Sequence, residues 1–90
     1  MKKYTPSTMI NRGMYAGMYE PDPSIDIIEA ESASAALSIY LEEIADNLNV
    51  VDAKRIDDGR YDGEAEFQYY DSDEELTTLT IRVEEVESDQ

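Results

Sequence analysis

The sequence predicts an α+β fold: a single two-layer domain in which an antiparallel sheet of four or five strands carries one long helix on one face. Three segments lead to this prediction. Residues 33–48 have the apolar periodicity of an amphipathic helix. Residues 64–70 and 77–86 alternate apolar and polar side chains, as half-buried strands do.

The length and composition favour one domain over residues 1–90. The chain contains no cysteine and no histidine. We therefore expect no disulfide, no thiolate metal site and none of the chemistry for which histidine is the usual general base. No apolar run approaches the ~20 residues of a membrane span. We expect a cytoplasmic monomer that does not contact the membrane.

The amino-terminal segment 1–13 is expected to form a short helix or an arm. Thr5 fits the N-cap position, Pro6 fits the first helical position, and Gly13 would end the helix. The sequence "GMYAGMY" follows, and then the turn cluster "EPDPS". This order predicts a first hairpin in which residues 14–19 pair with residues 24–30.

The helix at about 33–48 has the clearest signals. Ser32 fits the N-cap position, and Glu31 just before it is favourable near the positive end of the helix. An apolar stripe at helical spacing predicts the face that packs on the sheet. Its residues are Leu37, Tyr40, Leu41, Ile44 and Leu48.

Four further segments complete the prediction. Residues 50–57 are a weaker strand candidate, closed by the turn "DDG". Residues 64–70 and 77–86 form an antiparallel hairpin with one buried and one solvated face. Residues 87–90 are a tail that we expect to fray. The solvated face would carry Glu64, Glu66, Arg82 and Glu84.

The charge is the strongest functional signal. The net charge is −15, and all 22 acidic residues fall after residue 19. The stretch "DGEAEFQYYDSDEEL", residues 62–76, contains no lysine or arginine. Such a chain repels nucleic acid and attracts basic surfaces. We expect a basic nucleic-acid-binding protein as the partner, and no direct binding of nucleic acid.

Catalytic and metal-binding patterns are weak. "DSDEE" resembles the start of an EF-hand loop, but Leu76 stands where the loop requires glycine and Arg82 where it requires glutamate. The pair Glu64 and Glu66 is more typical of a solvated strand face than of a catalytic pair. We expect no catalytic residue, no metal, no cofactor and no enzymatic activity.

The predicted partner-binding surface combines carboxylates with tyrosines. Alternate side chains on a strand lie about 6.7 Å apart, much as neighbouring backbone phosphates do. A fixed carboxylate array could therefore occupy a groove built for nucleic acid, with tyrosines as interface anchors. The candidate residues are Asp57, Asp58, Tyr61, Asp62, Glu64, Glu66, Tyr70, Asp71, Asp73, Glu74 and Glu75. A face that only solvates the chain, with Tyr61 and Tyr70 as ordinary surface residues, is the alternative.

A strand leading through "EAESASAAL" into a helix, followed by acidic strands in a small chain without cysteine, resembles the small anti-CRISPR proteins of phages and mobile elements. Several members of that class mimic nucleic acid. The resemblance implies a non-catalytic inhibitor that blocks recognition of target DNA by a CRISPR effector.

Three alternatives remain open from the sequence. The chain could be an antirestriction protein or another DNA mimic, or an antitoxin-like accessory protein that neutralises a basic partner. It could also be a halophilic domain whose acidity serves solubility alone.

Overall fold

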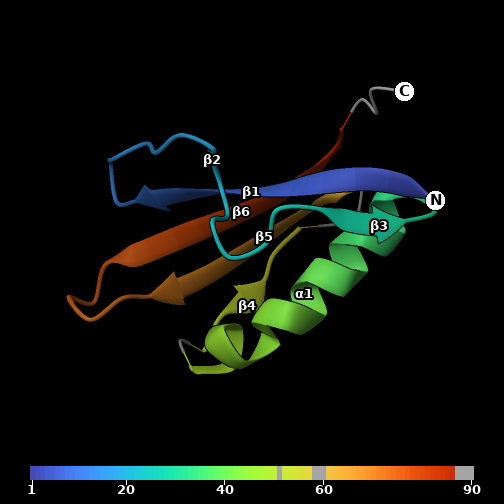
Figure 1. Cartoon of the computed structure of the whole chain (residues 1–90). Helices are drawn as coiled ribbons and strands as arrows, with labels where there is room; N and C mark the ends of the chain where they lie inside the picture. Colours follow the sequence, from blue (N-terminus) through green and yellow to red (C-terminus); the bar gives the residue numbers. More distant parts are fainter. Residues whose placement is uncertain (51, 58–60, 87–90) are drawn as a thin grey trace.

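An antiparallel sheet with one helix on one face forms the fold (Figure 1). The computed structural model describes residues 1–50, 52–57 and 61–86, and for residues 47–50 it describes the backbone alone. The sheet has six strands in the order β2-β1-β6-β5-β4, with β3 also paired to β1. The strands are β1 Lys2–Arg12, β2 Glu20–Pro21, β3 Ile28–Ala30, β4 Lys54–Arg55, β5 Glu64–Tyr70 and β6 Leu76–Glu85.

The expected single α+β domain is therefore confirmed, with six strands instead of four or five. The predicted hairpin is present, since β5 and β6 pair antiparallel from Glu64 opposite Arg82 to Tyr70 opposite Leu76. This register places Ala65, Phe67 and Ile81 on the helix side of the sheet and leaves the glutamates of β5 on the open side, as the alternation predicts.

Helix α1, Ala33–Val50, begins where the sequence predicts. The amide of Ala35 donates a hydrogen bond to the hydroxyl of Ser32 at 3.2 Å, which is the expected N-cap. The helix packs Ala36, Leu37 and Tyr40 against the sheet, whereas Leu41 and Ile44 are only partly buried at the margin of the core. The core consists of Tyr4, Ile28, Ala30, Ala36, Leu37, Tyr40, Ala65, Phe67, Ile81 and Val83.

The expectation of a short helix or arm over residues 1–13 is wrong, because β1 is a long strand paired with β6. Pro6 is compatible with this strand. Opposite it, the amide of Val83 bonds to the carbonyl of Gly63 at 2.8 Å, so β6 requires no bond from Pro6. The carbonyl of Pro6 faces the other edge, where the amide of Asp22 donates to it. At this edge the ring nitrogen interrupts no strand ladder, because the pairing of β1 with β3 ends at Tyr4 and its pairing with β2 begins at Ser7.

The predicted hairpin between residues 14–19 and 24–30 is also wrong. After a turn at Gly13 the chain doubles back along β1, with Tyr15 bridged to Arg12 and Glu20 opposite Thr8. Residues 24–30 contribute only β3, Ile28–Ala30, which pairs with Lys2–Tyr4 of β1. Both segments therefore pair with β1 and not with each other, because β1 offers a long edge.

The end of the helix and the start of the strand after it differ from the prediction. The helix runs to Val50, into the segment predicted as a strand, so that this strand is reduced to β4, Lys54–Arg55. Residues 87–90, the predicted tail, lie outside the described residues.

A partly buried hydrogen bond ties the segment between β2 and β3 to the helix. The hydroxyl of Tyr40, which is 1% exposed, donates to a carboxylate oxygen of Asp22 at 2.5 Å. Burial, followed by this bond, raises the pKa of Tyr40. The pKa of Asp22 is lowered by hydrogen bonds from Ser24 and then from Tyr40. The bond thus gives the hydroxyl of Tyr40, which packing takes out of water, a hydrogen-bond acceptor.

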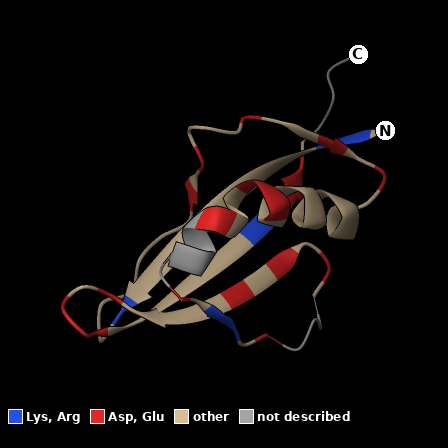
Figure 2. Cartoon of the chain, turned by 90° about the horizontal axis from the view of Figure 1, so that it is seen from below, with Lys and Arg blue, Asp and Glu red and all other residues tan. Residues whose placement is uncertain are grey.

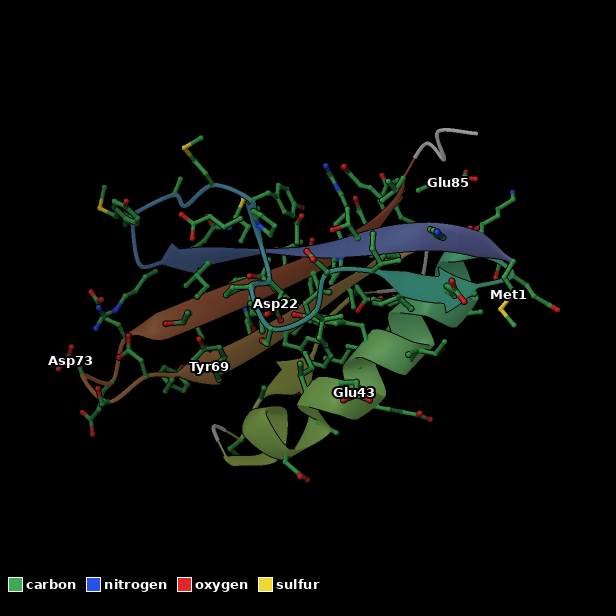
Figure 3. The ribbon with its side chains drawn as sticks, viewed as in Figure 1. Met1, Asp22, Glu43, Tyr69, Asp73 and Glu85 are labelled. Carbon is green, nitrogen blue, oxygen red and sulfur yellow. The ribbon has the colours of Figure 1, made fainter. Side chains whose placement is uncertain are left out.

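The molecule is elongated, with extents of 47 × 25 × 21 Å. Helix α1 lies beneath the end of the sheet that holds the amino terminus and β3, and the β5–β6 turn extends beyond it (Figure 1). Asp73, in that turn, lies at the opposite end of the molecule from Met1 (Figure 3). The acidic turn therefore lies apart from the helix-covered core.

Candidate functional site

The acidic turn between β5 and β6 is organised around the carboxylate of Asp71. One oxygen of this carboxylate accepts hydrogen bonds from the amides of Asp73 at 2.9 Å and Glu75 at 3.0 Å. The other oxygen accepts from the hydroxyl of Thr77 at 3.3 Å. Glu74 has a φ of 63°, in the left-handed region, which closes the turn. The carboxylate of Asp71 thus stabilises the shape of the turn.

Arg12 at the end of β1 binds this turn from 59 residues away. Its Nε lies 2.5 Å from Asp71 Oδ2 and 3.2 Å from Glu75 Oε2, and its Nη2 lies 2.5 Å from Asp73 Oδ2. Residues 62–76 contain no lysine or arginine, yet the fold brings Arg12 into contact with them. A planar guanidinium suits this arrangement because its donors diverge in a fixed fork.

The pKa values of this cluster reflect the hydrogen bonds. Partial desolvation acts to raise the pKa of Asp71, but bonds from the Glu75 amide, Arg12 and the Asp73 amide together outweigh it, so that the pKa is lowered. The bonds to Asp71 and Asp73 raise the pKa of Arg12. Both groups therefore remain charged at neutral pH.

The two strand glutamates of the predicted surface differ in their partners. Glu64 forms an ion pair with Arg82 at 2.9 Å, and Arg82 also reaches Glu84 at 3.3 Å. The ring of Tyr19 covers this arginine at 4.3 Å from its centroid. Glu66 is exposed, and no ion pair involves it within the described part of the chain. Of the two, Glu66 is the more available to a partner.

The remaining predicted residues do not form one surface. Asp57 is bound to Arg55 at 2.7 Å and also accepts the amide of Glu66 at 3.1 Å. Asp62 accepts the hydroxyl of Ser34 at 3.3 Å, at the start of the helix. Tyr61 is 66% exposed and Tyr70 is 69% exposed. Asp58 lies outside the described residues.

Acidic side chains occupy several elements and not the hairpin alone (Figure 2). All three arginines in the described segments bind carboxylates of this chain. Several exposed acids make no ion pair among the described residues, and the helix contributes three of them. They are Glu42, Glu43, Asp46, Glu66 and Glu74. The outward charge of the described surface is consequently dominated by carboxylates.

Among the described residues, no group of three or more carboxylates converges as a metal site would require. The Asp71 cluster is closed by Arg12, and the helix acids point into solvent. Within the same residues, no helix has the length and apolar content needed to cross a bilayer.

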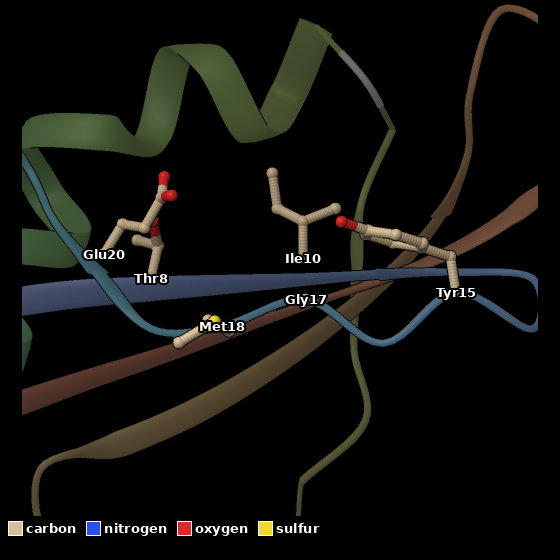
Figure 4. Close-up of a pocket in the computed structure, with 6 residues that line it drawn as sticks. All are labelled: Thr8, Ile10, Tyr15, Gly17, Met18 and Glu20. Carbon is tan, nitrogen blue, oxygen red and sulfur yellow. The ribbon is translucent and has the colours of Figure 1, made fainter.

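An apolar surface that the predicted site did not include lies beside the acidic turn. Ile10 on β1 is 48% exposed, and Tyr15 and Met18 are 74% and 81% exposed. These three residues line a shallow hollow of about 200 Å³ together with Thr8, Gly17 and Glu20. The Tyr15 ring extends toward Ile10 across this hollow (Figure 4). The sequence signal was "GMYAGMY", but its position against β1 depends on the fold.

Comparison of the chain with models of protein families, with curated proteins and with solved structures finds no match.

Proposed function

We propose that this chain is a non-catalytic inhibitor that binds the basic nucleic-acid-binding surface of a partner protein by presenting charge in place of a nucleic acid. The observation that carries the proposal is the disposition of charge. The arginines of the described residues all form internal ion pairs, whereas the exposed carboxylates of Glu42, Glu43, Asp46, Glu66 and Glu74 form none among these residues. A basic groove would therefore meet a surface on which exposed carboxylates outnumber the exposed lysines Lys2, Lys3 and Lys54 of the described residues.

The shape and charge density support the same proposal. A net charge of −15 along a 47 Å axis corresponds to one charge for about every 3 Å. A single strand of DNA carries one phosphate per about 3.4 Å of helix axis. The 47 Å length is that of about 14 base pairs at this rise. A groove that tracks a nucleic-acid backbone would thus meet comparable charge over a comparable length.

Among basic partners, we propose a CRISPR effector complex as the target, with recognition of DNA as the blocked step. The support is the resemblance of the strand-to-helix segment and the acidic strands to small anti-CRISPR proteins. A restriction enzyme and a basic toxin present the same kind of surface and belong in the test as competing targets.

The test is displacement of a labelled DNA duplex from purified target proteins. We expect the chain to displace the duplex from a CRISPR effector complex, and its affinity to fall at least about tenfold between 50 and 200 mM salt. If the chain displaces the duplex from a restriction enzyme and not from the CRISPR effector complex, the restriction enzyme becomes the proposed target. If it displaces no duplex but binds a basic toxin tightly, the toxin becomes the proposed target. No displacement from any of them at low salt would show that the acidity serves solubility.

A further inference from the structure

Helix α1 is too short to cover the helix side of the sheet. Its 18 residues span about 27 Å at 1.5 Å per residue, whereas the 11 residues of β1 span about 36 Å at 3.3 Å per residue. The register of β1 places Thr8, Ile10 and Arg12 on the helix side, in line with Ile81, Leu79 and Thr77 of β6. Beyond the helix, Ile10 is therefore left half exposed in the middle of a sheet face.

Tyr15 and Met18, in the segment that follows β1, add exposed apolar side chains beside Ile10. Gly13 has a φ of 57°, which permits the tight turn after β1. A Cβ at Gly17 would lie 2.2 Å from the carbonyl oxygen of Ile10, so the segment approaches β1 as only glycine allows. The two glycines thereby display Met14, Tyr15 and Met18 at exposures of 104%, 74% and 81%. Methionine side chains are flexible and adapt to varied apolar surfaces.

Two hollows meet at Ile10. One, of about 200 Å³, lies between Ile10 and the Tyr15–Met18 segment. The other, of about 260 Å³, lies between Ile10 and the side chains of Tyr69 and Thr77. Both are smaller than the roughly 300–1,000 Å³ of sites for drug-sized ligands. Each has room for an apolar side chain presented by another protein.

The rim of these hollows is acidic. Glu20 lines the first hollow, and Asp71 lines the second together with Arg12. Asp73 and Glu75 lie in the same turn as Asp71, and with it they outnumber the single Arg12 that they bind. A partner side chain entering either hollow would therefore be favoured by neighbouring lysine or arginine residues.

We propose that the surface formed by Ile10, Tyr15, Met18 and Tyr69 is the apolar anchor site of the interface, and that it takes an apolar side chain flanked by basic residues on the partner. This inference rests on the proposed function, because the occupant belongs to the basic partner named there. A few buried anchors commonly carry most of the binding energy of an interface, and surrounding charges steer the encounter.

A second copy of this chain is the poorer occupant. Two copies docked through this surface would bring two acidic turns together, and each chain carries a net charge of −15. Like charges placed together across an interface oppose association. The charge of the rim therefore favours a basic partner over self-association.

The experiment titrates the intact chain with two synthetic peptides, KKKLKKK and KKKSKKK, and follows methyl and amide resonances by NMR at low salt. We expect the leucine peptide to bind about tenfold more tightly, with its largest shift changes at Ile10, Tyr15, Met18 and Tyr69. Equal affinity of the two peptides, or shift changes centred on Glu42 and Glu43, would overturn the anchor site.

Matched variants distinguish the contribution of the apolar anchor site to peptide binding from the contribution of charge. Ile10→Ser should remove the preference for leucine and leave the salt dependence of binding unchanged, whereas Ile39→Ser should change neither. Ile39 is a fair control, since it is 40% exposed and lies on α1. An Ile39→Ser variant that loses the preference, or an Ile10→Ser variant that keeps it, would contradict the inference.

Two further outcomes are distinguishable. If neither peptide binds at low salt, the proposed function fails with the inference. If both bind equally and in a salt-sensitive way, the proposed function survives and only the anchor site fails. Sedimentation analysis in 500 mM salt should show a monomer; a dimer that Ile10→Ser abolishes would make a second copy the occupant and overturn the basic partner.

Discussion

Arg12 Nε lies 2.5 Å from Asp71 Oδ2, which joins the end of β1 to the acidic turn of the β5–β6 hairpin across 59 residues. The same guanidinium also binds Asp73 and Glu75. The turn therefore has a fixed shape in addition to its charge. Carboxylates held in a fixed arrangement bind a rigid partner better than carboxylates on a flexible turn do, because less conformational entropy is lost on binding.

Loss of this contact should loosen the turn more than the fold. In Arg12→Gln we expect faster hydrogen exchange at the amides of Asp73 and Glu75, since the Asp71 carboxylate that accepts them loses its cationic partner. Exchange in α1 should be unchanged. Arg12→Lys should recover only part of the protection, because an ammonium group lacks the forked geometry of guanidinium. Equal protection in wild type and Arg12→Gln would show that the turn holds itself.

Tyr40 should stabilise the fold through its hydroxyl as well as its ring. In Tyr40→Phe we expect the free energy of unfolding to fall by about 1–3 kcal/mol, because Asp22 loses a donor at a partly buried site. Urea denaturation measures this change. Tyr61→Phe is the matched control, since Tyr61 is 66% exposed, and it should have no effect. Equal stability of the two variants would contradict the role given to the bond.

Alanine substitutions on the sheet-facing side of α1 should reduce the free energy of unfolding by different amounts. Leu37 is 7% exposed, so Leu37→Ala should reduce the free energy of unfolding by about 2–5 kcal/mol. The sequence predicts the same cost for Leu41→Ala and Ile44→Ala. The structure places both at the margin of the core, so we expect each to cost less than Leu37→Ala. Thermal unfolding followed by circular dichroism tests the order, with the exposed Ser38→Ala as control. A larger loss in Leu41→Ala would show that the helix is rotated from this position.

Acid should weaken the contribution of Asp71. Its pKa is lower in the folded chain than the ordinary value of 3.8, so its contribution to stability is present above about pH 4. That contribution is lost as the pH falls through the lower folded value. The stability difference between wild type and Asp71→Asn should therefore be largest at pH 6–7 and shrink below pH 4. Urea denaturation across this range measures it, and a difference independent of pH would contradict this account.

Charge reversal should identify which acids bind. Glu66→Lys with Glu74→Lys should weaken displacement of DNA from the target at least about tenfold, because like charges would then meet across the interface. Both residues are exposed, so the fold should survive. Glu29→Lys with Glu31→Lys changes net charge equally from exposed positions preceding the helix, and should have a smaller effect. Equal losses in the two pairs would indicate a diffuse polyanion without a defined binding face.

Local sequence patterns predict the helix and the hairpin. Ser32 caps a segment whose apolar stripe has helical period, and residues 64–70 and 77–86 alternate with period two. These signals are local, and the neighbouring residues that produce them also stabilise the element. The acidity is likewise a property of composition, and the proposal of a basic partner begins from it.

The long strand β1, the arginine contacts and the exposure of Ile10 depend on tertiary structure. Thr5 and Pro6 fit the start of a helix locally, but pairing with β6 along the whole of β1 outweighs that weak preference. The carboxylates of residues 62–76 have no basic neighbour in sequence, yet Arg12 and Arg82 reach them through strand pairing. The exposure of Ile10 follows from the length of α1 relative to the sheet. Each of these results depends on contacts between distant residues, whose partners are set by packing and register and not by local pattern.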